Sequence, residues 1–260
     1  MLKVEGLHTH YGKSHILQGV DLEVKAGEAV ALLGRNGVGK TTTLRSIMGL
    51  TPPSGGTIVF DGGRIDSIAP HKIPRQGLGY VPQGRGIFPK LSVMENLCIG
   101  LDRAPARGEL DEIFRQFPIL KERADQAGGT LSGGEQQMLA IARCLIMRPK
   151  MILMDEPTEV IMPKLVTRIR DEIRAAIAKG ITILLVEQNF RLALSVCSRI
   201  YIMEKGVITY RGNSDDLRED PAIAHRYLGV AMNGGRGFVS GSGEERRNNP
   251  NKDRLEQGRT

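Results

Sequence analysis

The sequence predicts an α/β fold around a mixed, mostly parallel β-sheet, and three observations carry this prediction. Through residues 1–230, short apolar runs typical of strands alternate with segments of helical periodicity. Residues 151–154 and 181–186 are continuously apolar, as expected of strands that are buried on both faces. An amphipathic helix is expected between them, because apolar residues recur at every fourth position: Leu165, Ile169, Ile173 and Ile177.

Further strands are expected where shorter apolar runs end in turn residues. These runs are residues 4–7, 20–24, 29–33 and 57–60. Residues 200–203 and 207–210 flank Lys205-Gly206, which predicts a hairpin.

Two stretches differ from this alternation. Residues 91–147 are mostly helical in pattern and poor in strand signals, which predicts a helical subdomain inserted into the α/β core. Residues 231–260 are dominated by Gly, Asn, Ser and charged residues, so they cannot bury enough surface to offset the entropy of ordering. We therefore expect one domain over residues 1–230, followed by a disordered polar tail.

Composition narrows the class of protein. Of the 260 residues, 40% are hydrophobic and 25% are charged, which is typical of a globular protein and argues against disorder of the whole chain. No apolar run approaches the ~20 residues that a bilayer-spanning helix needs, and no secretory signal pattern is expected at the N-terminus. Cys98, Cys144 and Cys197 lie far apart and fit neither a zinc site nor a disulfide framework, so an intracellular, reducing location is expected.

The net charge of +7 is scattered along the chain. Aromatic residues make up only 4% and Trp is absent, which leaves few platforms for stacking nucleic-acid bases. We therefore expect no nucleic-acid partner.

The most specific motif is a glycine-rich loop between a predicted strand and a predicted helix. Residues 34–41 match the P-loop pattern, in which two glycines are followed by Lys40 and Thr41. The glycines let backbone N–H groups turn inward toward phosphate oxygens, and the helix adds its positive end. Lys40 would contact the outer phosphates and Thr41 would offer its hydroxyl to Mg²⁺. A P-loop NTPase core is therefore expected.

A pair of carboxylates follows the apolar run 151–154. An acidic residue at this place in a P-loop fold holds Mg²⁺, which assigns that role to Asp155. Glu156, beside the γ-phosphate, would orient or deprotonate the attacking water. The two residues predict an NTPase instead of a passive nucleotide sensor.

A second anion-binding feature is expected at residues 131–137, Leu-Ser-Gly-Gly-Glu-Gln-Gln. Ser132 is a good N-cap residue for the helix that follows, and Gly133 and Gly134 leave the backbone N–H groups uncovered.

With the P-loop and the Asp155-Glu156 pair, residues 131–137 resemble the signature motif of ABC-type ATPases. The resemblance covers residues 1 to about 230 and implies an antiparallel N-terminal β portion. It also implies a head-to-tail dimer, in which each ATP lies between one P-loop and the partner cassette's signature motif. ATP binding would then drive closure, and hydrolysis would reset the dimer.

The same resemblance assigns the remaining site residues. Tyr11 matches the aromatic residue that stacks on adenine, and Gln83 matches the loop glutamine that touches Mg²⁺ and links the site to the membrane partner. The predicted metal ligands are Thr41, Gln83 and Asp155. The predicted nucleotide-binding residues are Tyr11, Gly34, Arg35, Asn36, Gly37, Val38, Gly39, Lys40, Thr41, Thr42, Gln83, Ser132, Gly133 and Gly134.

Two positions depart from the family pattern. Gln188 stands where the switch histidine is usual, so we expect it to join Glu156 in catalysis as a neutral hydrogen-bond donor. The loop after Glu156 lacks its common Asp, and relatives tend to have Gly where this chain has Val160.

Within the family, residues 186–189 (Val-Glu-Gln-Asn) and 81–85 (Val-Pro-Gln-Gly-Arg) resemble the ATP-binding subunits of branched-chain amino-acid importers. Urea and short-amide importers are near relatives and remain an alternative, and a soluble non-transport ABC ATPase is a third interpretation. The interpretation as a branched-chain amino-acid importer subunit implies ATP and Mg²⁺ as cofactors. Its implied partners are two membrane permeases, a second cassette (a heterodimer, or a homodimer when isolated) and, indirectly, a periplasmic solute-binding protein. It implies peripheral attachment to the cytoplasmic face of the bacterial inner membrane, with a soluble isolated subunit.

Overall fold

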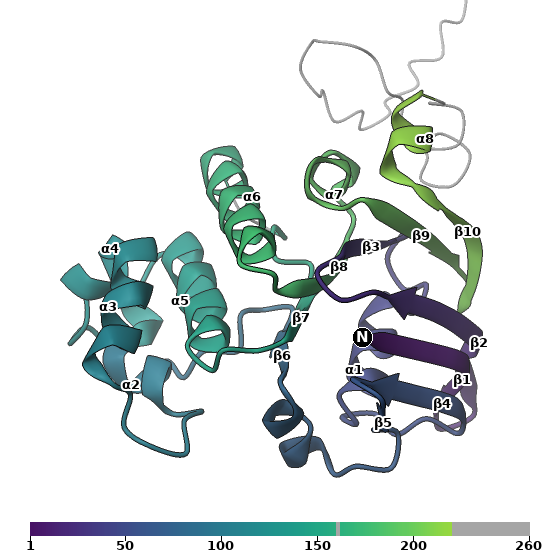
Figure 1. The fold of residues 1–260 in the computed structure, drawn as a ribbon, viewed down its shortest axis with the longest axis horizontal. Helices are drawn as coiled ribbons and strands as arrows, with labels where there is room; N and C mark the ends of the chain where they lie inside the picture. The colour runs from purple at the N-terminus through teal and green to yellow at the C-terminus, as the bar shows by residue number, and fades with distance from the viewer. Residues whose placement is uncertain (160–161, 220–260) are drawn as a thin grey trace, which may run out of the picture.

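The centre of the fold is a six-stranded sheet whose inner strands run parallel (Figure 1). The computed structural model describes residues 1–159 and 162–219, and in that part the strand order is β10-β9-β3-β8-β7-β6. Among these described strands, β10 pairs with β9 in the antiparallel direction and all other neighbouring strands pair in parallel. The strands are β3 (Ala29–Leu33), β6 (Leu78–Val81), β7 (Met151–Asp155), β8 (Thr182–Glu187), β9 (Arg199–Glu204) and β10 (Val207–Asn213). The mixed, mostly parallel sheet expected from the sequence is confirmed.

An antiparallel sheet of order β2-β1-β4-β5 lies beside it, as expected for the N-terminal portion (Figure 1). Its strands are β1 (Leu2–Tyr11), β2 (Ser14–Val24), β4 (Gly55–Phe60) and β5 (Gly63–Arg64). Strand β1 is longer than the predicted run 4–7. Its second half alternates buried Leu7 and Thr9 with half-buried His8 and exposed His10, so hydrophobicity alone misses it.

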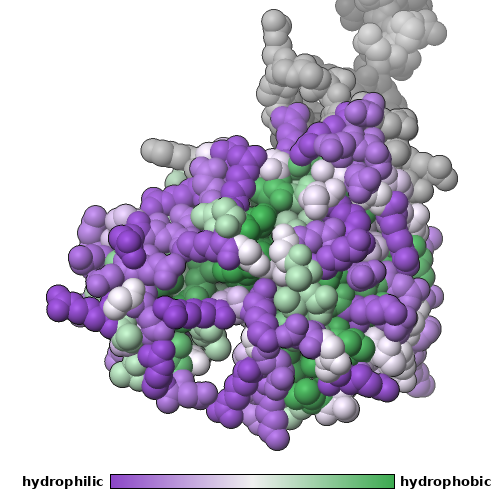
Figure 2. All heavy atoms as spheres, viewed as in Figure 1, coloured by the Kyte–Doolittle hydropathy of each residue, from purple (hydrophilic) through white to green (hydrophobic). Residues whose placement is uncertain are grey.

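The parallel sheet is the middle layer of the molecule. Ala31 and Leu33 of β3 pack in the cluster that includes α5 (Gly133–Leu145), α6 (Pro163–Ala178) and α7 (Phe190–Val196). Val30 and Leu32 point the other way, into the cluster that includes α1 (Lys40–Ile47) and the antiparallel sheet. On the face drawn in Figure 2, hydrophobic residues gather toward the middle and hydrophilic ones dominate the periphery. Burial on both faces explains the continuous apolar runs.

Helices dominate the stretch between β6 and β7. They are α2 (Val93–Cys98), α3 (Arg107–Gln116), α4 (Pro118–Glu122), the short 3₁₀ turn η3 (Gly128–Thr130) and α5. Figure 1 shows α2 to α5 grouped on the side away from the antiparallel sheet. The other described helical elements are η1 (Pro70–Lys72), η2 (Pro74–Gln76) and α8 (Ser214–Glu219). The predicted tail 231–260 and Val160 lie outside the described residues.

Two strands, the two-residue β5 and the longer β6, have no counterpart in the sequence-based expectations. Strand β6 contains Gly79, which breaks its apolar run, and it spans only four residues. A Cβ at Gly79 would lie 2.4 Å from the Cys144 Sγ, so the glycine allows α5 to pack closely against the strand.

The buried strands predict the effect of a core truncation. Leu184 of β8 is 0% exposed, so Leu184→Ala removes buried methyl groups and leaves a cavity. We expect the free energy of unfolding, measured by urea denaturation, to fall by about 2–5 kcal/mol. The matched control is Leu50→Ala, because Leu50 is 45% exposed and should change it by less than about 0.5 kcal/mol. Equal effects of the two substitutions would contradict the layer arrangement.

Candidate functional site

The glycine-rich loop joins the end of β3 to the start of α1. Gly37 and Gly39 have φ angles of 77° and 113°, in the region that favours glycine. Gly39 is the N-cap of α1 and gives no side-chain cap, so the first N–H groups of the helix are available to a ligand. A Cβ on Gly39 would lie 2.9 Å from a Leu17 methyl carbon, so packing also requires glycine there. The loop therefore has the shape of an anion cradle.

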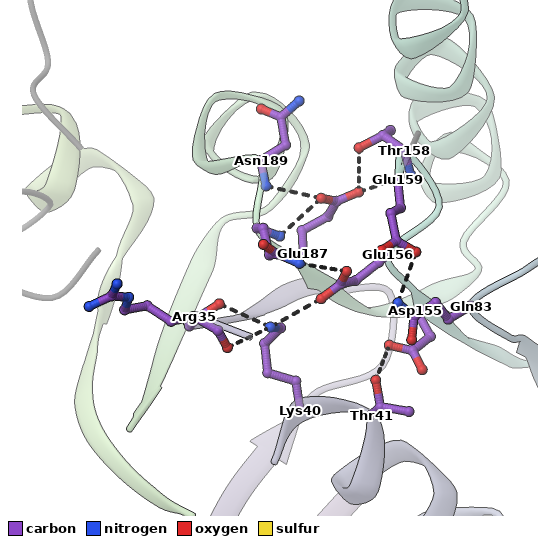
Figure 3. Close-up of polar contacts among 12 residues, drawn as sticks. Arg35, Lys40, Thr41, Gln83, Asp155, Glu156, Thr158, Glu159, Glu187 and Asn189 are labelled. Carbon is purple, nitrogen blue, oxygen red and sulfur yellow. Dashed lines mark hydrogen bonds and ion pairs between the residues drawn. The ribbon is translucent and has the colours of Figure 1, made fainter. Parts of the chain in front are cut away.

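Lys40 lies buried across this loop (Figure 3). Its Nζ donates to the carbonyl oxygens of Gly34 at 2.9 Å and Arg35 at 3.1 Å. The same nitrogen lies 3.1 Å from Glu156 Oε1. A buried ammonium needs such partners, because desolvation of an unpaired charge costs several kcal/mol. The lysine is thus held at the mouth of the loop, beside the predicted catalytic base.

Glu156 is held in place by contacts and by its backbone. Its φ of 47° is unusual for a residue other than glycine. Its backbone N–H donates to the Val186 carbonyl at 2.9 Å, which ties this conformation to β8. Gln188 Nε2 donates to Glu156 Oε2 at 2.7 Å, so the two predicted catalytic residues are in direct contact. Both oxygens of the buried carboxylate are therefore engaged, one by Lys40 and one by Gln188.

Asp155 closes β7 next to the loop. Its carboxylate accepts from Thr41 Oγ1 at 3.0 Å and from Tyr80 OH at 3.3 Å. Burial, reinforced by the nearby Glu156 charge, raises the pKa of Asp155 to about 6. A cation at this position would favour the ionised form again.

The hydroxyl and carboxylate oxygens of Thr41 and Asp155 fit Mg²⁺, which prefers oxygen ligands and is usually held by one or two protein groups plus phosphates. Within residues 1–159 and 162–219, no group of three His, Cys, Asp or Glu side chains is arranged to hold a metal by itself.

Gln83, the third predicted metal ligand, points its amide toward a different carboxylate. Its Nε2 donates to Glu159 Oε2 at 2.8 Å, so this side chain lies at the rim of the site and not on Asp155 (Figure 3). Tyr11 also lies at the rim, 47% exposed, with its OH 3.2 Å from Thr51 Oγ1.

Two adjoining clefts contain most of the predicted nucleotide-binding residues. A cleft of about 370 Å³ is lined by Tyr11, Ile16, Asn36, Gly37, Gly39, Lys40, Thr41, Thr42, Gln83, Glu156 and Glu159. A wider groove of about 810 Å³ is lined by Gly34, Arg35, Asn36, Val38, Gln188, Glu204 and Lys205. Segments from β1, the glycine-rich loop, the end of β6 and the end of β7 thus meet in one place.

Ser132, Gly133 and Gly134 line neither cleft. They start α5, where Ser132 and Glu135 form a capping box: Ser132 N donates to Glu135 Oε2 at 2.8 Å, and Glu135 N to Ser132 Oγ at 3.4 Å. Gly134 is packed against α6, because a Cβ there would lie 2.1 Å from Leu165 Cδ1. The structure therefore does not bring these three residues to the P-loop of the same chain.

Sequence reasoning missed Glu187, the last residue of β8. Its carboxylate is 2% exposed and accepts from Thr158 N at 3.2 Å, Thr158 Oγ1 at 2.7 Å, Gln188 N at 3.1 Å and Asn189 N at 3.0 Å. Burial raises the pKa of Glu187, and these hydrogen bonds oppose the rise. Glu187 holds the loop after Glu156 against the loop that carries Gln188. The signal was present, since Glu187 ends an apolar strand as Asp155 does.

Comparison with known proteins decides the family. Residues 17–159 match the family model described as ABC transporter. The chain belongs to the ABC transporter family. It is 39% identical over 232 residues to the high-affinity branched-chain amino acid transport ATP-binding protein BraG of Pseudomonas aeruginosa, covering 88% of this chain and 100% of that protein. It is 37% identical over 235 residues to the lipopolysaccharide export system ATP-binding protein LptB of Haemophilus influenzae, covering 88% and 97%.

Solved structures of ABC cassettes share the fold. A nucleotide-free ATP-binding cassette from an ABC transporter aligns with a TM-score of 0.74 at 27% identity, covering 86% of this chain and 97% of that one. A dimeric post-hydrolysis cassette bound to ADP and Pi also aligns with a TM-score of 0.74 at 27% identity, covering 82% and 99%. The chain is therefore an ABC ATP-binding subunit, a P-loop ATPase. None of its described helices has both the length and the apolarity to cross a bilayer.

The environment of Glu187 gives a test of the site's framework. Glu187→Gln keeps the size of the side chain but turns an amide N–H₂ group toward backbone N–H donors, leaving buried groups unpaired. We expect the free energy of unfolding, measured by urea denaturation, to fall by about 1–3 kcal/mol. Glu5→Gln is the control, because Glu5 is an exposed carboxylate that pairs with exposed Lys3. If Glu187→Gln lowered the free energy of unfolding no more than Glu5→Gln, the role of Glu187 as a buried acceptor that holds the two loops together would be contradicted.

Proposed function

We propose that this ABC ATPase energises a bacterial importer of branched-chain or other hydrophobic amino acids. The observation that carries the chemistry is the contact network of Lys40, Glu156 and Gln188 at one cleft, beside Asp155 and Thr41. The choice of solute is supported by the near full-length similarity to BraG, and by 34% identity to a probable branched-chain amino acid transport ATP-binding protein, LivF of Archaeoglobus fulgidus. The similarity to LptB makes export of lipopolysaccharide the competing assignment.

ATP would bind along the cleft that runs from Tyr11 to Glu156. The exposed ring of Tyr11 would stack on adenine, and the backbone N–H groups of residues 34–42 would surround the phosphates. Lys40 would exchange its two loop carbonyls for phosphate oxygens, since a charged oxygen is a stronger acceptor than a carbonyl. The phosphates carry more negative charge than one carboxylate, so they would also draw Lys40 away from Glu156.

Release of Lys40 would leave Glu156 free to act. Its carboxylate would orient the attacking water and take its proton, which is the work of a general base. Gln188 already donates to Glu156, and it would position this carboxylate or donate to the γ-phosphate without a titrating proton.

Mg²⁺ would be held by Thr41 and Asp155, and when bound it would neutralise charge on the β- and γ-phosphate oxygens. Gln83 would leave Glu159 to join this site. Tyr80 would keep the Asp155 carboxylate oriented through its hydroxyl.

The separation of Ser132 from its own P-loop supports a dimeric mechanism. Ser132, Gly133 and Gly134, on a helical subdomain of residues 91–147, would complete the nucleotide site of a second cassette. That cassette would be a distinct chain in the transporter or a second copy in isolation. Two permeases would dock on the pair at the cytoplasmic face of the membrane, and a periplasmic binding protein would deliver solute.

The experiment on solute uses cells that lack this gene and measures uptake of radiolabelled leucine, isoleucine and valine, with urea as a comparison. We expect amino-acid uptake to fall and to return with the wild-type gene. Restoration should fail with a Lys40→Ala gene, because Lys40 is the buried cation of the phosphate loop. Normal amino-acid uptake would contradict the proposed solute. Lost urea uptake would then assign urea as the solute, and a defect in lipopolysaccharide export would assign lipopolysaccharide.

Glu156→Gln tests the chemistry. The substitution keeps the size of the side chain and removes the carboxylate, while Lys40, Thr41 and Asp155 are unchanged. Hydrolysis should fall by at least the ~10²-fold typical of losing a general base, and ATP should still bind. The measurement is single-turnover hydrolysis with the permeases and partner cassette present, beside nucleotide binding to the subunit. The closed ATP-bound dimer should accumulate, which a sizing column detects.

Gln188→Ala is the matched comparison. It removes one hydrogen bond from an uncharged donor and leaves the Glu156 carboxylate in place, so its effect on turnover should be smaller than that of Glu156→Gln. A wild-type rate for Glu156→Gln, or a greater loss for Gln188→Ala, would show that Glu156 is not the base.

A further inference from the structure

The loop that follows Gln83 adopts a costly conformation. Gly84, Arg85 and Gly86 all have positive φ angles, of 74°, 72° and 57°. Glycine bears this at little cost, but for a residue with a Cβ the left-handed region costs roughly 1–2 kcal/mol. An arginine in the middle position therefore needs contacts that outweigh this cost.

Those contacts join the loop to the first turn of α5. Arg85 Nη1 donates to Gln136 Oε1 at 2.9 Å. A Cβ on Gly133 would lie 2.9 Å from Arg85 Nη2, so the guanidinium rests directly on the backbone of the signature motif. Gln136 continues the chain of contacts by donating from Nε2 to the Leu131 carbonyl at 3.1 Å. Arg85 and Gln136 thus contact Gly133 and Leu131, the two residues that flank Ser132 in the sequence.

A second arginine, on α5, also holds this loop. Arg143, farther along α5, donates from Nη2 to the Gly86 carbonyl at 2.7 Å and lies 5.5 Å from the centre of the Phe88 ring. The loop is therefore attached to α5 at two separate turns of the helix. Such a loop cannot shift relative to the helix without breaking charge-assisted contacts.

Charge alone does not account for Arg85. A cation beside the N-terminus of a helix is opposed by the helix dipole. What arginine supplies at this position is a planar group with several donors, which can rest on a glycine backbone and reach the Gln136 amide at the same time. Geometry, and not attraction to the helix end, explains the residue type.

We propose that Arg85 is a positioning residue that fixes the start of α5, and with it Ser132, relative to Gln83. This rests on the proposed function, in which Gln83 meets the nucleotide of its own subunit and Ser132 meets that of the partner. A displacement of the Gln83 loop in one site is then carried by Arg85 to the other site. Within each chain, Arg85 and its Gln136 contact couple the two composite sites at the start of α5, while Arg143 holds the loop farther along the helix.

The first experiment is hydrogen exchange, followed by mass spectrometry, on the full chain without nucleotide. In Arg85→Ala, the amides of residues 131–137 should exchange at least about tenfold faster, the size expected from losing a charge-assisted hydrogen bond. Arg85→Lys should behave in the same way, because lysine keeps the charge and lacks the planar fork. Arg75→Ala is the control, since Arg75 is an exposed arginine paired with exposed Asp102. Unchanged exchange in Arg85→Ala, or wild-type exchange in Arg85→Lys, would overturn the positioning role.

The second experiment measures coupling in the Glu156→Gln background. With Arg85→Ala added, ATP binding to the single subunit should stay within about twofold, while the ATP-bound dimer should need at least about tenfold more protein to form. Gln136→Ala should reproduce this shift, and the loss in the double variant should be clearly smaller than the sum of the two single losses, because both substitutions remove the one contact that the two side chains share. Dimer formation like that of the Glu156→Gln parent, or additive losses, would overturn the coupling.

The two experiments also separate this inference from the proposed function. If the Glu156→Gln parent itself forms no ATP-bound dimer, head-to-tail closure is refuted. The exchange measurement then decides the positioning role of Arg85 by itself, because it uses the nucleotide-free chain.

Discussion

Charge buried at the carboxyl edge of the parallel sheet is the constraint on which the site depends. Lys40, Asp155, Glu156 and Glu187 are 4%, 1%, 7% and 2% exposed. Taking such groups out of water costs several kcal/mol each unless each finds a partner. Every one of them has such partners: Lys40 and Glu156 pair with each other, Asp155 takes two hydroxyls, and Glu187 takes four donors. The loops around the site are fixed because they supply these partners.

The order of the strands makes this pairing possible. Strand β8 lies between β3 and β7, and all three run parallel, so their carboxyl ends meet at one edge. That edge receives the phosphate loop from β3, the Asp155-Glu156 pair from β7 and Glu187 from β8. Residues more than a hundred positions apart in the chain become neighbours there, as is common at the carboxyl ends of strands in α/β sheets.

The sequence predicts the parts of the site whose chemistry is local. The glycine-rich loop and the two carboxylates follow directly from their neighbours in the chain, because a strand, a turn and a helix start impose fixed residue types. Partners from distant segments cannot be found this way. The Gln188 contact to Glu156 and the Arg85 contact to Gln136 join residues 32 and 51 positions apart, and neither leaves a periodic pattern. Strand β6 was missed for a related reason, since the need for Gly79 arises from α5 packing against it.

The packing of Gly134 affects how substitutions in the signature motif should be understood. The space for a Cβ at this glycine is taken by Leu165 from α6, which belongs to the same chain. An alanine there must displace that side chain before it meets any ligand. Loss of activity in such a variant would therefore combine a folding defect with any lost contact to nucleotide. Ser132 is better suited to mutagenesis, because its side chain makes a helix cap and not a core contact.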